Sequence, residues 1–337
     1  MIDKILVSNN SALMTKYGSG LATIQGAIAR VIAADQARGL QSLYVSLDDA
    51  AAMQAAAGQP VANPADQQQN KAAVDALYTF YSPQYLVLVG GPDVVPHQDL
   101  TNPAYDPPDH DPDQFVPSDL PYACNAGYSQ EINDFLGPSR VVSRLPDVTG
   151  SNDPGYLVHV LELAAAAIPL TRQDYADYLG VSAQVWSVST GLSLSAIFGD
   201  SANLQSVPPA NYQWPQALLG TRSHLFNCHG GSNSPQYLGQ DAAGYPVAHD
   251  AAYIAGKVTS GTLAAAECCY GAELYDPNGP AGGQMGIANT YMNEGAYGFW
   301  GSTTIAYGPA EYNGAADLIC QYFMQETLAG ASKNSLP

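Results

Sequence analysis

Short apolar runs separated by segments of helical spacing are the feature that most constrains the fold of this chain. The clearest run, YLVLVGG at residues 85–91, is continuously apolar up to two glycines. A run of this kind predicts a strand that is buried on both faces of a parallel sheet. Similar runs predict further strands at 4–8, 43–47, 139–148, 183–189, 224–228, 262–268 and 295–303.

Segments with helical periodicity lie between these runs. The apolar residues of 21–32 recur every three or four positions, which is the period of one helix face, and Gly39 follows where a C-terminal cap is expected. Asn63 and Pro64 predict the start of a helix that continues to Phe80. Further helices are predicted near 155–168, after Asp250 and at 313–328.

The alternation of strands and helices predicts an α/β protein with mostly parallel sheet. A segment rich in Pro and Asp at 102–122 interrupts the alternation and is predicted to be irregular. We place a domain boundary near residue 150. This gives an N-terminal α/β subdomain at 1–150 and a C-terminal subdomain at 151–337.

The charge balance limits the classes of partner. The 337 residues include 11 Lys or Arg and 30 Asp or Glu, for a net charge of -19. Nucleic acids and anionic membranes bind clustered basic residues, so neither is expected as a partner. Cationic substrates fit this charge, although an acidic surface also serves solubility alone. The first residues lack the pattern of a secretion signal, so we expect a cytoplasmic protein unless a leader has been removed.

The cysteines do not form the pattern of a disulfide framework. There are five, which is an odd number, and two of them are neighbours in sequence. They are Cys124, Cys228, Cys268, Cys269 and Cys320. Free thiols are therefore expected.

Two predicted strands end on chemically reactive side chains followed by glycine. One stretch is LFNCHGG at 225–231, with His229, and the other is LAAAECCYG at 263–271, with Cys269. If the two strands are parallel neighbours, their carboxyl ends meet at one sheet edge, where active sites of open α/β sheets lie. A thiol and an imidazole in that position are the components of nucleophilic acyl transfer.

Within this arrangement each residue has an expected role. His229 is the general base and acid. Cys269 is preferred to Cys268 as the nucleophile, because it is nearer to the turn and successive strand residues face opposite ways. The amides of Gly230 and Cys269 are candidates for an oxyanion hole.

Two other interpretations of these residues stay open. Cys228, His229, Cys268 and Cys269 could bind zinc, but adjacent residues on a strand diverge and zinc ligands are usually spaced by two or more. Alternatively, the cysteines are small apolar residues of the core, as free cysteine often is.

The sequence resembles the gingipain-type cysteine peptidases of the caspase–legumain–gingipain group. The resemblance is carried by His229-Gly230, by the ECCYG stretch at 267–271, and by four longer segments. These are YLVLVGGPDVVP (85–96), PSDLPYA (117–123), SRVVSRLPD (139–147) and GAYGFWGSTTIAYGP (295–309). The resemblance spans most of the chain.

This resemblance implies a caspase-like α/β fold, a three-layer sandwich in two side-by-side subdomains, with residues 151–337 as the catalytic one. It implies hydrolysis of peptide bonds in protein or peptide substrates by a Cys269–His229 dyad, with no cofactor. Glu267 matches a position that lines the primary specificity pocket in related families, where a carboxylate favours Arg or Lys. Its alternative role is a hydrogen-bonded acid beneath the sheet. Ser302, Thr303 and Tyr307 match the pocket wall.

The sequence departs from the gingipain pattern at one catalytic position. Gingipains carry an acid after the fourth strand that orients the histidine, whereas the corresponding end here reads SVSTGLS at 187–193. Asp200 could replace that acid, or the dyad works without it. Two further functions stay open: a catalytically silent module that binds peptides, and a transpeptidase that uses the same thioester. The sequence makes no prediction of the oligomeric state.

An acidic loop is the remaining candidate site. The stretch YDPPDHDPD at 105–113 offers carboxylates to a hard cation such as Ca²⁺, although it lacks the regular spacing of an EF-hand. The candidate ligands are Asp106, Asp109, Asp111 and Asp113. A solvated acidic loop is the alternative interpretation.

Overall fold

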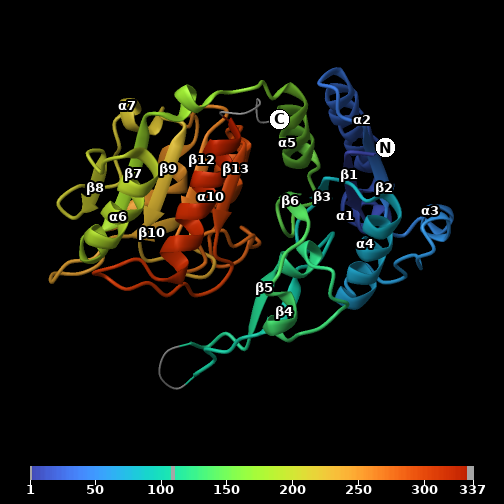
Figure 1. Ribbon diagram of the computed structural model, residues 1–337, viewed down its shortest axis with the longest axis horizontal. Helices are drawn as coiled ribbons and strands as arrows, with labels where there is room; N and C mark the ends of the chain where they lie inside the picture. Colours follow the sequence, from blue (N-terminus) through green and yellow to red (C-terminus); the bar gives the residue numbers. More distant parts are fainter. Residues whose placement is uncertain (1, 108–110, 332–337) are drawn as a thin grey trace. The chain divides into compact units, whose positions relative to one another are not determined.

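The computed structural model describes residues 2–107 and 111–331. The chain folds as two units, Met1–Ala166 and Ala167–Pro337. Each unit is an α/β structure with its own parallel sheet (Figure 1). The α/β class predicted from the sequence is therefore confirmed. No described helix combines the length and the apolar character that crossing a membrane requires.

Unit 1 is built on a four-stranded sheet in the order β2-β1-β3-β6. All three pairings are parallel. In β1 and β3, every residue after the first is buried, as the continuous apolar runs predict. The strands are β1 (Lys4–Ser8), β2 (Ser42–Ser46), β3 (Tyr85–Val89) and β6 (Val141–Leu145).

Five described α-helices belong to this unit, and the last of them, α5, places the domain boundary later in the chain than predicted. Helix α5 packs against α2, and its Leu157 and Leu161 are fully buried in the core of unit 1. The boundary therefore follows Ala166 instead of residue 150. The helices are α1 (Asn10–Tyr17), α2 (Leu21–Ala37), α3 (Ala50–Ala55), α4 (Gln67–Tyr81) and α5 (Gly155–Ala166).

Two local predictions for unit 1 are wrong. Helix α4 starts after Asp66 instead of at Pro64, because the Asp66 carboxylate caps the helix by accepting a hydrogen bond from Gln69 N at 2.9 Å. The segment 102–122 is also not wholly irregular. It contains strand β5 (Phe115–Ser118), which forms an antiparallel pair with β4 (Gln98–Thr101).

Unit 2 is built on a five-stranded sheet in the order β13-β12-β9-β7-β8, which is parallel throughout. The strand predicted at 183–189 is wrong in position: the strand is β7, and Ser187 already begins a helix. The sequence does not show YLGVSA as a continuous apolar run, because Gly180 and Ser182 interrupt it. The strands are β7 (Tyr178–Ala183), β8 (Leu204–Val207), β9 (Ser223–Asn227), β12 (Leu263–Ala266) and β13 (Gly298–Gly301).

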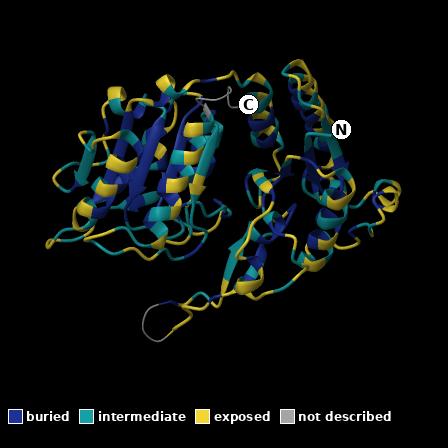
Figure 2. Cartoon of the chain, viewed as in Figure 1, coloured by how far each residue is buried: buried dark blue, intermediate teal, exposed yellow. Residues whose placement is uncertain are grey.

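Helices cover both faces of this second sheet, and its central strands are buried, as their dark blue colour in Figure 2 shows. On one face α6 (Ser187–Phe198) and α10 (Ala315–Ala331) pack together, and α10 lies on β12. On the other face lie α8 (Ala251–Ile254) and α9 (Ile287–Asn293), whose buried residues share a core with β9 and β12. Helix α7 (Gln216–Leu219) and the antiparallel hairpin of β10 (Gln236–Leu238) and β11 (Val247–Asp250) complete the unit.

Short 3₁₀ turns connect several of these elements in both units. They lie at Gly18–Gly20, Leu120–Ala123, Ile132–Phe135, Arg172–Tyr175 and Gln184–Trp186.

Candidate active site

The two strands with reactive ends are neighbours in the sheet of unit 2. Strands β9 and β12 pair in parallel, with Ala266 opposite Phe226. The pairing continues past the strands, because Glu267 N donates to Phe226 O at 2.8 Å. Cys269 lies three residues past the end of β12, and His229 lies two residues past the end of β9. The predicted meeting of the two strand ends at one sheet edge is therefore confirmed.

Gly230 makes the closest contact between the two strand ends. A Cβ atom built on Gly230 would lie 1.8 Å from the carbonyl oxygen of Cys269, so no other residue fits without moving the backbone. Glu273 ties the following loops together: its carboxylate accepts hydrogen bonds from Ser232 Oγ at 3.0 Å and Asn233 N at 2.6 Å. The loop after β9 and the loop after β12 are thus held together by backbone and side-chain contacts.

The two neighbouring cysteines, which follow β12 in a turn, differ in burial. Cys268 is fully buried with Cys228 in the core on the α9 face, and burial raises the pKa of the Cys268 thiol well above its ordinary value. Cys269 is half-buried, whereas Cys124, Cys228, Cys268 and Cys320 are buried. Its Sγ donates to Ala306 O at 3.5 Å. Cys269 is therefore the least buried of the five cysteines.

The structure does not gather the four residues of the zinc interpretation into one group. Cys228 and Cys268 belong to the buried core, while His229 and Cys269 lie at the edge of the sheet. Across residues 2–107 and 111–331, no three His, Cys, Asp or Glu side chains come together in a way that could hold a metal ion.

His229 is held by an amide and two aromatic rings. Its Nε2 lies 2.7 Å from Oε1 of Gln240, and its ring centre lies 4.4 Å from that of Trp186 and 5.1 Å from that of Tyr245. An amide oxygen only accepts hydrogen bonds, so Nε2 of His229 donates to Oε1 of Gln240. The backbone of His229 is fixed by a hydrogen bond from its N to Leu238 O at 2.9 Å. The imidazole is thus held in place by its contact with Gln240, by two aromatic rings and by the fixed backbone.

Asp200 does not orient this histidine. Its carboxylate accepts hydrogen bonds from Tyr178 OH at 2.7 Å and from Ala202 N at 2.9 Å. The partner of His229 is the neutral Gln240 instead. Trp186 also contacts the imidazole. It lies three residues past the end of β7.

Glu267 is a buried, hydrogen-bonded acid. It is 8 % exposed, and its side chain is hydrogen-bonded to that of Asp317 in the first turn of α10. Burial, followed by the charge of Asp317 and that hydrogen bond, raises the pKa of Glu267 to about 9. Its Oε1 is buried and has no hydrogen-bond partner. Glu267 is therefore protonated at neutral pH, with an acceptor oxygen left unpaired.

The predicted pocket-wall residues lie in the segment after β13, which contacts the loop of Cys269. Ser302 O accepts a hydrogen bond from Ala272 N at 2.8 Å. Ser302 Oγ donates to the carbonyl oxygen of Thr304, within its own segment, at 2.8 Å. Tyr307 is 53 % exposed. Thr303 lies in the same segment, whose Thr304 O accepts a hydrogen bond from Tyr270 N at 2.7 Å.

The acidic loop does not form the predicted calcium site among the described residues. Asp111 is buried, and its carboxylate accepts hydrogen bonds from Asn102 Nδ2 at 3.1 Å and from Asp113 N at 3.0 Å. Asp106 is exposed and pairs with Asp111 through the backbone. Asp109 lies outside the described residues. The carboxylate of Asp111 thus stabilises the loop. Among the described residues, the acids of this loop do not form a group that could hold a metal ion.

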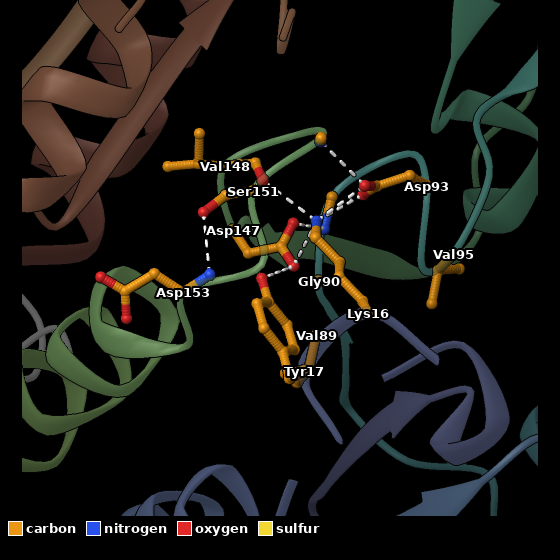
Figure 3. Close-up of polar contacts among 12 residues, drawn as sticks. Lys16, Tyr17, Val89, Gly90, Asp93, Val95, Asp147, Val148, Ser151 and Asp153 are labelled. Carbon is orange, nitrogen blue, oxygen red and sulfur yellow. Dashed lines mark hydrogen bonds and ion pairs between the residues drawn. The ribbon is translucent and has the colours of Figure 1, made fainter. Parts of the chain in front are cut away.

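Unit 1 has a polar cluster of its own at the carboxyl ends of its strands (Figure 3). The ammonium of Lys16 lies 2.7 Å from Asp93, 2.9 Å from Asp147 and 3.0 Å from the carbonyl oxygen of Val148. The hydroxyl of Tyr17 donates to Asp147 as well. A depression of about 380 Å³ borders Lys16 and Asp93. Because an ammonium has three donors and all three are used here, this cluster is structural.

Sequence reasoning missed five residues of the unit 2 site. Trp186 was assigned to the interior of a strand, and Gln240 and Tyr245 lie on a hairpin whose fold the sequence does not reveal. An acid in the first turn of a predicted helix is a recognisable signal, and it could have drawn attention to Asp317. Glu273 had no such signal.

Comparisons with known proteins add no family assignment. No protein-family model, no curated protein and no solved structure matches this chain.

Proposed function

We propose that this chain is a cysteine endopeptidase of the gingipain-like, caspase-fold type that cleaves peptide bonds after Arg or Lys. One observation carries the proposal. The least buried cysteine of the five, Cys269, follows β12, and His229 follows the neighbouring parallel strand β9. The touching backbones of Gly230 and Cys269 support the same geometry.

The proposed chemistry uses both residues in each half-reaction. Nδ1 of His229 takes the proton of the Cys269 thiol, and the sulfur attacks the carbonyl carbon of the scissile bond. The amides of Gly230 and Cys269 stabilise the negative oxygen that forms. His229 then gives the proton to the departing amine, which leaves a thioester. Water, deprotonated by His229, hydrolyses the thioester and restores the thiol.

The neutral partner of His229 defines how this dyad differs from a triad. The oxygen of Gln240 fixes the tautomer of the imidazole but adds no negative charge, so it stabilises the imidazolium less than a carboxylate does. The chemistry needs a reduced thiol and no metal or cofactor.

The preference for a basic residue is supported by the electrostatics around Cys269. Glu267 lies two residues before Cys269, is buried, and keeps an unpaired acceptor oxygen. A carboxylate in that environment is stabilised by a cationic side chain of the substrate.

The test is digestion of a mixed peptide library by the full chain under reducing conditions. We expect cleavage after Arg and Lys by the native protein and by Cys268→Ala, and none by Cys269→Ala. A native protein that leaves every peptide intact would identify a silent peptide-binding module. Products joined to an added amine would identify a transpeptidase. Loss of activity in Cys268→Ala but not in Cys269→Ala would overturn the assignment of the nucleophile.

A further inference from the structure

A buried tyrosine joins the hairpin that supports His229 to the turn that carries Cys269. Tyr237 lies on β10 and is 2 % exposed. Its hydroxyl donates a hydrogen bond to the carbonyl oxygen of Gly271, which is also buried and lies two residues after Cys269. The bond spans 34 positions of the sequence. It therefore links the hairpin to the Cys269 turn from inside the core of unit 2.

The same hairpin holds His229. Leu238, the residue after Tyr237, forms an antiparallel bridge with His229, with N–H···O distances of 2.8 and 2.9 Å in the two directions. Two residues further, Oε1 of Gln240 accepts the hydrogen bond of the imidazole Nε2 at 2.7 Å. Gln240 is itself fixed by its backbone N, which donates to Val207 O at 3.1 Å. Strand β10 and the residues after it thus hold His229 by its backbone and by its ring.

The turn that carries Cys269 has a conformation that depends on its contacts. Tyr270 has a positive φ of 54°, which is uncommon for a residue with a side chain. Its N–H donates to the carbonyl oxygen of Thr304 at 2.7 Å, in the segment after β13. The bond from Tyr237 instead holds a carbonyl group of the turn and comes from the hairpin of His229. Of these two anchors, Tyr237 is therefore the one that relates the turn to the histidine.

Proton transfer between a thiol and an imidazole depends steeply on the distance and the direction between the two groups. We propose that Tyr237 is a positioning residue for the dyad, because its hydrogen bond to Gly271 holds the turn of Cys269 against the hairpin that holds His229. This inference rests on the proposed function, since it concerns the geometry of that same site. Tyr237 acts through the hairpin and the turn, and not on the substrate.

The chain offers a matched control at the opposite end of β12. Tyr175 is fully buried, and its hydroxyl donates to the carbonyl oxygen of Gly261 at 3.0 Å, before the strand begins. Tyr175→Phe and Tyr237→Phe thus each remove one hydroxyl from a buried glycine carbonyl and keep the aromatic ring. A loss of stability that both variants share reports the missing hydrogen bond alone. A loss of activity confined to Tyr237→Phe reports the position of the turn.

The first measurement is turnover by the full chain. In peptide assays Tyr237→Phe should lower kcat about tenfold or more, with KM within about threefold of the native value. Tyr175→Phe should keep both constants within about threefold. A change in kcat without a change in KM is expected because the substrate still binds while the thiol and the imidazole are misaligned.

The second measurement follows the dyad without turnover. Alkylation of Cys269 by iodoacetamide at pH 7 is measured by mass spectrometry in the native and His229→Ala backgrounds. Tyr237→Phe should slow this alkylation about tenfold in the native background and less than about twofold in His229→Ala, since the effect acts through the histidine. Cys320, which is buried in the same unit, should stay unlabelled and so shows that each variant is folded.

The outcomes separate this inference from the proposed function. Equal kcat and alkylation rates in Tyr237→Phe and Tyr175→Phe would overturn the inference even if peptides are cleaved. So would an equal change of alkylation in the two backgrounds, or labelling of Cys320 in Tyr237→Phe alone, because the hydroxyl would then serve only the fold. The predicted dependence on His229 upholds the inference even if no peptide is cleaved. Native alkylation that His229→Ala does not slow would refute the dyad itself, and both proposals with it.

Discussion

Replacement of Glu267 by Gln should stabilise unit 2, and the gain should grow with pH. The pKa of this carboxyl is raised from 4.5 to about 9 by burial and by Asp317. Below pH 4.5 both the folded and the unfolded chain hold the proton, so folding is not affected. Between pH 4.5 and 9 the unfolded chain releases the proton while the folded chain keeps it. The free energy of unfolding therefore falls as pH rises through this range.

The magnitude follows from the size of the pKa shift. Each pH unit in this range lowers the free energy of unfolding by about 1.4 kcal/mol. At pH 7, 2.5 units above the ordinary value, the native protein loses about 3 kcal/mol relative to a chain with a neutral residue there. Gln keeps the shape and a donor toward Asp317 but does not ionise. For a unit of this size, about 3 kcal/mol corresponds to a rise of roughly 6–12 °C in Tm.

Tryptophan fluorescence is a suitable assay, because the three tryptophans all lie in unit 2. They are Trp186, Trp214 and Trp300. Unfolding of the native protein, Glu267→Gln and the exposed control Glu326→Gln would be followed at pH 4.5, 6, 7 and 8. We expect no difference at pH 4.5, a growing gain for Glu267→Gln above it, and little change for the control. A gain that is equal at all pH values, or a less stable Glu267→Gln at pH 7, would refute the reasoning.

Three further changes test other parts of the structure. Gly230→Ala places a Cβ where the carbonyl oxygen of Cys269 lies, so it should lower kcat/KM about 100-fold or more in peptide assays. Gly231→Ala, which has room, should keep activity within about threefold, and equal losses in the two would contradict the contact. Gln240→Ala frees the imidazole of its partner and should lower kcat up to about 100-fold with little change in KM, and an unchanged kcat would exclude a positioning role. Lys16→Met leaves a fully buried carboxylate in unit 1 without its cation and should cost about 3–5 kcal/mol, seen by circular dichroism without a shift in tryptophan fluorescence.

The sequence predicted the elements whose signal is local. Continuous apolar runs located β1, β3 and β9, and three- and four-residue spacing located α2 and α4. The spacing of apolar residues within each segment indicates whether one or both of its faces are buried, so no distant contact is needed for the prediction. The start of α4 was wrong by three residues, because Asp66 outcompetes Asn63 as the capping side chain.

Elements whose burial depends on distant partners were harder to predict. Strand β7 is buried although Gly180 and Ser182 interrupt its apolar run, since Gly180 lies against Leu194 of α6. The true domain boundary depends on α5, which reads like the start of the second unit but packs on α2 of the first. In both cases the deciding contact is with another element and is not apparent from the segment itself.

The candidate site shows the same division. The strand ends and the choice of Cys269 over Cys268 followed from alternation and from the topology of parallel strands. The partner of His229 did not follow, because Gln240 reaches it through a hairpin that is not apparent in the sequence. The pairing of Glu267 with Asp317 joins a strand end to a helix 50 residues later, which no local pattern indicates.

The central claim is that the sulfur of Cys269 is the nucleophile activated by His229. Treatment of the full chain with an arginine acyloxymethyl ketone, followed by mass spectrometry of the peptides, tests it most directly. The account predicts one adduct, on Cys269, that forms in the native protein and is lost or strongly slowed in His229→Ala. An adduct on another cysteine, or labelling at the same rate without His229, would contradict it.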